Sequence, residues 1–215
     1  MDERVVEQAV TALRAGQPVV LPMDTVYGLC ADPYRAEPVQ RLYELKGRAA
    51  KQPTALVAAD LETLFELVPE LRGRAILPGP FTLILPNPAK RYPWLTGDRP
   101  ETIGVRVPEL SGPGRAVLDA VGAIAATSAN LPGEPDPRTL DEVPDEIREA
   151  CAALVDGGEL PGTPSTVIDL TGPEPTVLRE GAVSAEEALA RVSEAQRGAG
   201  RRYPRAADAP PRPRA

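Results

Sequence analysis

Apolar residues recur along the chain at two spacings, which predict an interleaved set of helices and strands. Val6, Val10 and Leu13 fit one face of a helix over residues 2–15, and Gly16 stands at its C-cap position. The same helical periodicity is found over residues 37–45, 61–68, 112–121, 141–153 and 184–196. Short apolar runs predict strands over residues 18–22, 54–59, 81–86, 102–108, 123–130, 165–170 and 176–181. Because strands and helices alternate irregularly, we expect an α/β fold with a twisted mixed sheet and flanking helices.

Polar residues at two predicted helix starts support these boundaries. Asp60 directly precedes the helix over residues 61–68, where its side chain can accept a hydrogen bond from the first turn. Ser184 and Glu187 have the spacing of a capping box at the start of the last helix. We expect this helix to end the folded part near Gln196.

The end of the chain differs in composition from the rest. Residues 197–215 contain six arginines, four prolines and one aspartate, and almost no large apolar side chain. This composition predicts a disordered tail of net charge +5 after a single domain over residues 1–196. The whole chain carries −7, so the domain carries −12. Such an acidic domain argues against broad binding of nucleic acids but is compatible with one small basic pocket.

The composition also argues against several classes of protein and site. Hydrophobic residues make up 42% of the chain and charged residues 26%, which is ordinary for a globular protein. The chain has no run of about 18 apolar residues, so no membrane span is predicted. The start MDERVVEQAV lacks the basic-then-apolar order of a secretory signal. The chain has no histidine, and Cys30 and Cys151 lack metal-ligand spacing. We therefore expect a cytoplasmic protein with no metal site of its own.

Two polar motifs are candidates for binding phosphate. In KGRAAKQP, Lys46 and Arg48 stand where a helix is predicted to end. There they can converge on phosphate oxygens or simply complement the helix dipole. In TSAN, Ser128 and Asn130 follow a small apolar strand. They can donate to a phosphate or a sugar, or form an ordinary turn.

Polar residues in or beside apolar strands form a second group of candidates. Arg106 in IGVRVP and Arg179 in TVLREG are arginines within apolar strands. An arginine in such a strand has three alternatives: it faces solvent, pairs with an acid or lines a ligand cavity. Ser165 precedes the apolar run of PSTVID. Thr25 lies in LPMDTVYGLC, a stretch with more functional groups than a plain turn requires, so we expect a loop that holds a ligand.

Seven motifs, taken together and in order, resemble the YrdC-like family of threonylcarbamoyl-AMP synthases. They are PMDTVYGL, KGR, GPFTLIL, TIGVRVP, TSAN, PSTVID and LREG, and the resemblance covers about residues 5–190. It implies a single α/β domain with a concave, positively charged cavity, in the short form of the family. It also implies a nucleotidyltransferase that joins L-threonine, bicarbonate and ATP into L-threonylcarbamoyladenylate and releases pyrophosphate, with Mg²⁺ accompanying ATP. A tRNA threonylcarbamoyl-transferase complex would use that product.

The resemblance further implies a role for individual residues. Lys46 and Arg48 would bind the triphosphate and act as the catalytic residues. The rest of the nucleotide site would comprise Thr102, Ser128, Asn130 and Arg179. The threonine substrate would be surrounded by Thr25, Arg106 and Ser165, with the arginine binding its carboxylate. Carbamate formation and attack on the α-phosphorus need positioning and charge neutralisation, which cations and hydroxyls can provide. No residue stands out as a general base.

The chain departs from the family pattern at Met23, where a threonine is usual, and at Ala49 and Pro132. Met23 removes a hydroxyl beside the expected threonine pocket, which can change substrate preference. Two alternatives therefore stay open. One is a paralogue that acts on another amino acid or carbamoyl compound. The other is an RNA-binding or ribosome-associated protein that uses the same cavity. The acidic domain speaks against the second, although the basic tail could contact RNA weakly.

Overall fold

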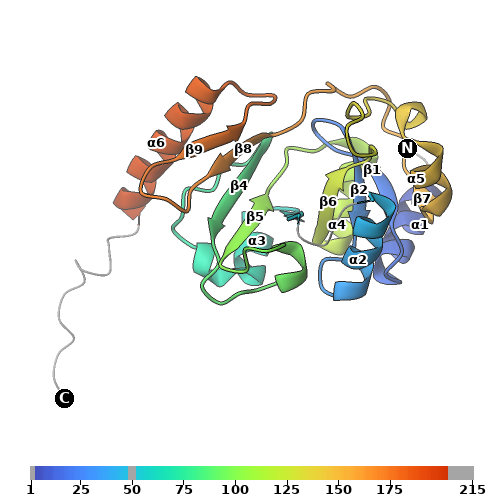
Figure 1. Cartoon of the computed structure of the whole chain (residues 1–215), viewed down its shortest axis with the longest axis horizontal. Coiled ribbons are helices and arrows are strands. Elements are labelled where there is room, and N and C mark those ends of the chain that lie inside the picture. The colour runs from blue at the N-terminus through green and yellow to red at the C-terminus, as the bar shows by residue number, and fades with distance from the viewer. Residues whose placement is uncertain (1–2, 48–51, 203–215) are drawn as a thin grey trace, which may run out of the picture.

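The computed structural model describes residues 3–47 and 52–202, and in these ranges nine strands form one sheet (Figure 1). The strands are β1 Val19–Pro22, β2 Tyr27–Ala31, β3 Ala55–Ala58, β4 Phe81–Pro86, β5 Thr102–Arg106, β6 Ala123–Ser128, β7 Ala153–Leu154, β8 Thr166–Asp169 and β9 Thr176–Arg179. Their order is β7-β1-β2-β6-β3-β5-β4-β8-β9. β1 runs parallel to β7, β3 to β5 and β4 to β8, and the five other neighbouring pairs are antiparallel. The expected α/β fold with a mixed sheet is confirmed.

Helices flank the sheet. Over the described ranges the α-helices are α1 Glu3–Arg14, α2 Ala36–Leu45, α3 Leu61–Leu67, α4 Gly112–Val121, α5 Asp145–Ala150 and α6 Ala185–Arg202. The short 3-10 helices are η1 Pro69–Leu71, η2 Pro93–Leu95 and η3 Leu140–Glu142. α6 lies beside β8 and β9 at one end of the molecule, and α1 lies beside β7 at the other (Figure 1).

The alternating direction of side chains along the strands separates two hydrophobic clusters. Leu56 of β3 and Val105 of β5 belong to the larger cluster, which also takes side chains from α2, α3, α5 and α6. Val57, the next residue of β3, belongs to the smaller cluster, together with side chains from α1 and α4. Because successive strand residues point to opposite faces, the two clusters lie on opposite faces of the sheet.

The smaller cluster covers only part of its face. Among the described residues, it takes no side chain from β4, β5, β8 or β9. On β4, Phe81 and Leu83 are buried in the larger cluster, whereas Thr82 between them is only half-buried. The face that carries Thr82 is therefore open at this end of the sheet, where no helix of the smaller cluster covers it.

Strand β2 was not predicted, because Tyr27 and Gly28 were assigned to a ligand-holding loop. In the structure β2 is buried along its whole length and pairs antiparallel with β1 in the register Leu21 opposite Gly28. The hydroxyl of buried Tyr27 donates to Gly158 O at 2.8 Å and accepts from the backbone N–H of Gly157 at 3.0 Å. Tyr27 therefore anchors the chain near residue 157, and the loop itself is limited to the residues between the two strands.

The helix predicted over residues 141–153 is divided in the structure. η3 ends at Glu142, α5 begins at Asp145, and Pro144 stands between them. Proline has no N–H to donate and disfavours helical backbone in the residue before it, so one continuous helix cannot form. The end of the predicted helix is instead β7, which pairs with β1 at the edge of the sheet.

The last helix is longer than predicted. α6 continues to Arg202, so residues 197–202 extend the helix instead of starting a disordered tail. Alanine and arginine in this segment are good helix formers and favour the extension, whereas the two glycines at positions 198 and 200 oppose it. The remainder of the predicted tail, residues 203–215, lies outside the described ranges.

Candidate functional site

A row of cross-strand neighbours runs along the open face of the sheet. Its registered pairs are Gly28 with Ser128, Ala55 with Ala126, Val57 with Arg106, Thr82 with Val167, and Val167 with Arg179. Directly opposed residues point to the same side of the sheet. The register therefore brings two arginines and several hydroxyls, from strands far apart in sequence, onto one surface.

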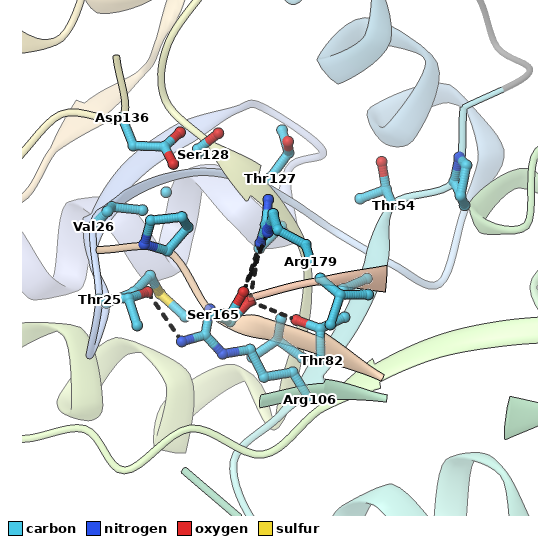
Figure 2. A pocket seen from close by; sticks show the side chains of 18 residues that line it. Thr25, Val26, Thr54, Thr82, Arg106, Thr127, Ser128, Asp136, Ser165 and Arg179 are labelled. Atoms are coloured by element: carbon cyan, nitrogen blue, oxygen red, sulfur yellow. Dashed lines mark hydrogen bonds between the residues drawn. The ribbon is translucent and has the colours of Figure 1, made fainter. Parts of the chain in front are cut away.

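This row is the floor of a cavity of about 190 Å³. Five of the residues predicted to form the site line it: Thr25, Arg106, Ser128, Ser165 and Arg179. Thr127, Ser128 and Asp136 lie on one side of the cavity, and Arg106 and Thr82 lie on the opposite side (Figure 2). The strand register explains how two arginines from separate strands, β5 and β9, come to line the same cavity.

Arg106 is held in place by two residues of the loop between β1 and β2. Its Nη2 donates to Asp24 Oδ1 in a short ion pair and to Thr25 Oγ1 at 3.1 Å. The side chains of Arg106 and Asp24 are 10% and 9% exposed. Burial raises the pKa of the Asp24 carboxyl, and the positive charge of Arg106 opposes that rise. Burial likewise lowers the pKa of Arg106 against the influence of Asp24, so each charge needs the other.

Each member of this ion pair keeps one buried polar atom without a hydrogen bond. These atoms are Arg106 Nε and Asp24 Oδ2. A buried donor without a partner is costly unless a ligand or water satisfies it. Arg106 lines the cavity, so its Nε is a candidate contact for an anionic group of a ligand. Asp24 was missed in the sequence. The signal that could have found it was the position of Arg106 inside an apolar strand, where an arginine that is buried needs an acidic partner.

Ser165 and Arg179 form a second group on the same floor. Arg179 Nη2 donates to Ser165 O at 2.9 Å, and the hydroxyls of Ser165 and Thr82 lie 2.8 Å apart (Figure 2). Gly181 allows this arrangement, because a Cβ at that position would lie 2.1 Å from Pro164 O. The glycine of LREG therefore lets the segment after β9 pack closely against the segment before β8.

Lys46 lies next to the cavity, behind Ser128. It caps the C-terminus of α2 and is fully buried, and its Nζ donates to Ser128 O at 2.9 Å and to Asn130 Oδ1 at 2.7 Å. Ser128 Oγ also donates to Asn130 Oδ1, at 2.7 Å. The structure thus joins Lys46 to the TSAN turn, although neither Lys46 nor Asn130 lines the described cavity.

Thr102, another predicted nucleotide contact, is not in this cluster. Thr102 begins β5 and donates its hydroxyl to Arg99 O at 3.1 Å. It lies four residues from Arg106 along the same strand, which corresponds to roughly 13 Å. Arg48 lies outside the described residues.

Thr54 and Asp136 are among the polar cavity residues that the sequence analysis missed. Thr54 is buried, lines the cavity and has no hydrogen-bond partner for its hydroxyl. Asp136 supplies the one carboxylate found among the described lining residues. Neither carries a local signal, since Thr54 sits in a predicted strand and Asp136 in a proline-rich loop.

Neither cysteine of the chain lines the described cavity. Cys30 is buried, and burial raises the pKa of its thiol. Burial also raises the pKa of Cys151, to about 12. Over residues 3–47 and 52–202, no group of three or more cysteine and acidic side chains could hold a metal ion. In the same ranges no helix is long and apolar enough to cross a membrane.

Comparison with known proteins places this geometry in a family. A family model described as telomere recombination, built from Sua5, YciO and YrdC proteins, matches residues 11–181. The chain belongs to the Sua5/YciO/YrdC family. The match contains all the predicted site residues and the whole floor of the cavity.

Individual members of the family cover most of the chain. The threonylcarbamoyl-AMP synthase of Stenotrophomonas maltophilia is 35% identical over 73% of this chain and 88% of its own length. That of Bacillus subtilis is 34% identical over 85% of this chain, which spans 55% of the longer relative. The crystal structure of Pyrococcus abyssi Sua5 complexed with L-threonine superposes with a TM-score of 0.79 at 33% identity. That alignment covers 90% of this chain and 58% of Sua5.

Proposed function

We propose that this member of the family is an L-threonylcarbamoyladenylate synthase. It would convert L-threonine, bicarbonate and ATP into threonylcarbamoyl-AMP, pyrophosphate and water. Relatives over the whole domain carry this activity in their names, and one structural neighbour holds L-threonine. The observation that carries the proposal is the pair of arginines in one cavity, Arg106 beside Asp24 and Thr25, and Arg179 beside Ser165.

The amino acid binds at Arg106. Its carboxylate accepts a hydrogen bond from the unpartnered Nε, and this charge-assisted contact fixes one end of the substrate. Thr25 and Asp24 hold the guanidinium in place, so little reorganisation is needed when the substrate enters. The amine then points across the floor toward Ser128.

The nucleotide binds on the remaining walls. Arg179 and the buried charge of Lys46 attract the triphosphate, and Ser128 and Asn130 provide polar groups beside it. Thr102 and Arg48 complete the predicted nucleotide contacts. Asp136 is a hard oxygen donor on the Ser128 side, which is the kind of ligand that fits the Mg²⁺ accompanying ATP. When bound, that ion neutralises charge on the phosphates.

The reaction needs no protein nucleophile. The amine of threonine and bicarbonate lose water to give a carbamate, and a carbamate oxygen attacks the α-phosphorus while pyrophosphate leaves. The residues of this cavity position the carbamate and neutralise charge on the leaving group. The product would pass to a tRNA threonylcarbamoyl-transferase complex in the cytoplasm, and the basic tail would add at most a weak contact with RNA.

Pyrophosphate release by the purified protein tests this function. With ATP, Mg²⁺ and bicarbonate present, we expect release to depend on L-threonine, and omission of bicarbonate to abolish it. Lys46→Met and Arg106→Met should each lower the rate at least about tenfold, since each removes a charge-assisted contact. Arg115→Met is the matched control, because Arg115 pairs with Asp119 on α4, outside the cavity.

Two results would contradict the proposal. Pyrophosphate release that does not depend on threonine would indicate that a different compound reacts with ATP. If the protein does not bind ATP, it is not a synthase, and the RNA-binding alternative is favoured. That alternative requires a steep salt dependence of RNA affinity that disappears when residues 203–215 are deleted.

A further inference from the structure

One side of the cavity floor is apolar. Between Arg106 and Ser128 the floor consists of Val57, Ala55 and Ala126, which come from β3 and β6. Gly28, opposite Ser128, adds no side chain of its own. No hydroxyl, amide or charged side chain of the described floor lies between the two ends of this stretch.

Met23 fills the space that Gly28 leaves. A Cβ at Gly28 would lie 3.1 Å from Met23 Cγ, so the methionine side chain packs directly on the glycine. Met23 lines the cavity and is 5% exposed. Met23 therefore packs on the apolar floor at Gly28, and its thioether offers only a weak hydrogen-bond acceptor.

The hydroxyls on the other side of Arg106 are already engaged. Ser165 and Thr82 bond to each other, and Arg179 bonds to both the carbonyl and the hydroxyl of Ser165. An amino acid with its carboxylate at Arg106 and its amine directed toward Ser128 lies over the apolar stretch. Its side chain then meets Met23, Val57 and Ala126.

We infer that Met23 is a specificity-determining residue, and that this site selects a branched aliphatic shape rather than a hydroxyl. This inference rests on the proposed function. Valine has the shape of threonine with a methyl group in place of the hydroxyl, and an apolar pocket discriminates weakly between such isosteres. Serine keeps the hydroxyl but lacks the methyl group that fills the floor. The expected order is threonine and valine within about 100-fold of each other, and serine well below both.

The test measures this order in two ways. The values of kcat/KM for pyrophosphate release with threonine, valine and serine give the ranking in catalysis. Calorimetric titration of the same three amino acids gives the ranking in binding. Met23→Thr should introduce a hydroxyl partner and raise the preference for threonine over valine by about tenfold or more. Met23→Leu is the matched control and should preserve the wild-type order, because it keeps an apolar side chain of similar volume.

The outcomes separate this inference from the proposed function. A wild-type preference for threonine over valine above about 100-fold would overturn the role of Met23. So would an unchanged ratio in a folded Met23→Thr variant. If no amino acid supports pyrophosphate release, the synthase proposal fails, and the calorimetric order still tests the apolar floor.

Discussion

Arg106 and Arg179 line one cavity but are held in opposite ways. Arg106 is almost buried and forms an ion pair with Asp24. Arg179 is exposed and bonds to the carbonyl and hydroxyl of Ser165, with no carboxylate partner among the described residues. A buried cation needs a nearby negative charge, whereas water can stabilise an exposed one.

This difference separates two kinds of binding site within a single row of the sheet. The Arg106–Asp24 pair has little net charge, so it suits the carboxylate end of an amino acid that is itself neutral overall. Arg179 keeps its full charge and suits a polyanion such as a triphosphate.

Removing the buried arginine should have the largest effect. Arg106→Met should weaken L-threonine binding at least about 100-fold, since it removes the buried, charge-assisted contact. It should also lower the free energy of unfolding by about 3 kcal/mol at neutral pH, because Asp24 is left buried and unpaired. Calorimetry and urea unfolding measure the two effects. The double variant with Asp24→Asn should regain stability but not threonine binding.

The pH dependence of the Arg106→Met variant follows from the Asp24 carboxyl. Burial raises the pKa of this group above 3.8, and the charge of Arg106 is the largest of the influences that oppose the rise, ahead of backbone hydrogen bonds. Without Arg106 the folded pKa rises further. A group whose pKa is raised by folding contributes stability below its unfolded pKa and loses that contribution as the pH rises through the folded pKa. The stability deficit of the variant should therefore shrink on acidification, and a constant deficit would contradict the ion-pair account.

Removing the exposed arginine should have a smaller and different effect. Arg179→Met should weaken ATP binding about tenfold and leave threonine binding within about threefold of the wild type, because a solvated charge contributes less than a buried one. Arg179→Lys keeps the charge and should recover part of the ATP affinity. Titration with each ligand separately measures both effects. If Arg179→Met lost threonine binding and kept ATP binding, Arg179 would belong to the threonine site and not to the ATP site.

Gly181 tests whether the Ser165 group depends on close backbone packing. In Gly181→Ala the new Cβ would lie 2.1 Å from Pro164 O, so the segment that carries Ser165 must move. We expect a loss of about 1–3 kcal/mol in stability and a several-fold lower kcat/KM. Gly172→Ala is the matched control, since its Cβ would meet only Glu174 O at 3.6 Å. Equal effects of both substitutions would refute the packing argument.

Asp136 should give the smallest effect. Its carboxylate repels the triphosphate when no metal ion is present, so Asp136→Asn should strengthen ATP binding about threefold in the presence of a chelator. With Mg²⁺ this advantage should disappear, because the carboxylate then has a cation to bind. Titrations with and without Mg²⁺ provide the comparison. An advantage that persists with Mg²⁺ would exclude Asp136 as a ligand of the ion.

The sequence predicted some features of this site well and others poorly, for identifiable reasons. Helices and most strands follow from local periodicity, which needs no knowledge of distant residues. The position of Lys46 at a helix end was also predictable, because helix termination is local. Strand order and register are long-range properties, so the sequence could not show that Arg106 and Arg179 share one floor. The ion pair between Arg106 and Asp24 depends on the same register. Strand β2 was missed because Gly28 is typical of a turn.

The most direct test of the account is a set of four calorimetric titrations, in which Arg106→Met and Arg179→Met are each titrated with L-threonine and with ATP. We expect Arg106→Met to lose threonine binding and retain ATP binding, and Arg179→Met to lose about tenfold in ATP affinity and retain threonine binding. If both variants lose the same ligand, or each loses both while remaining folded, the two arginines do not form separate sites and the central claim is wrong.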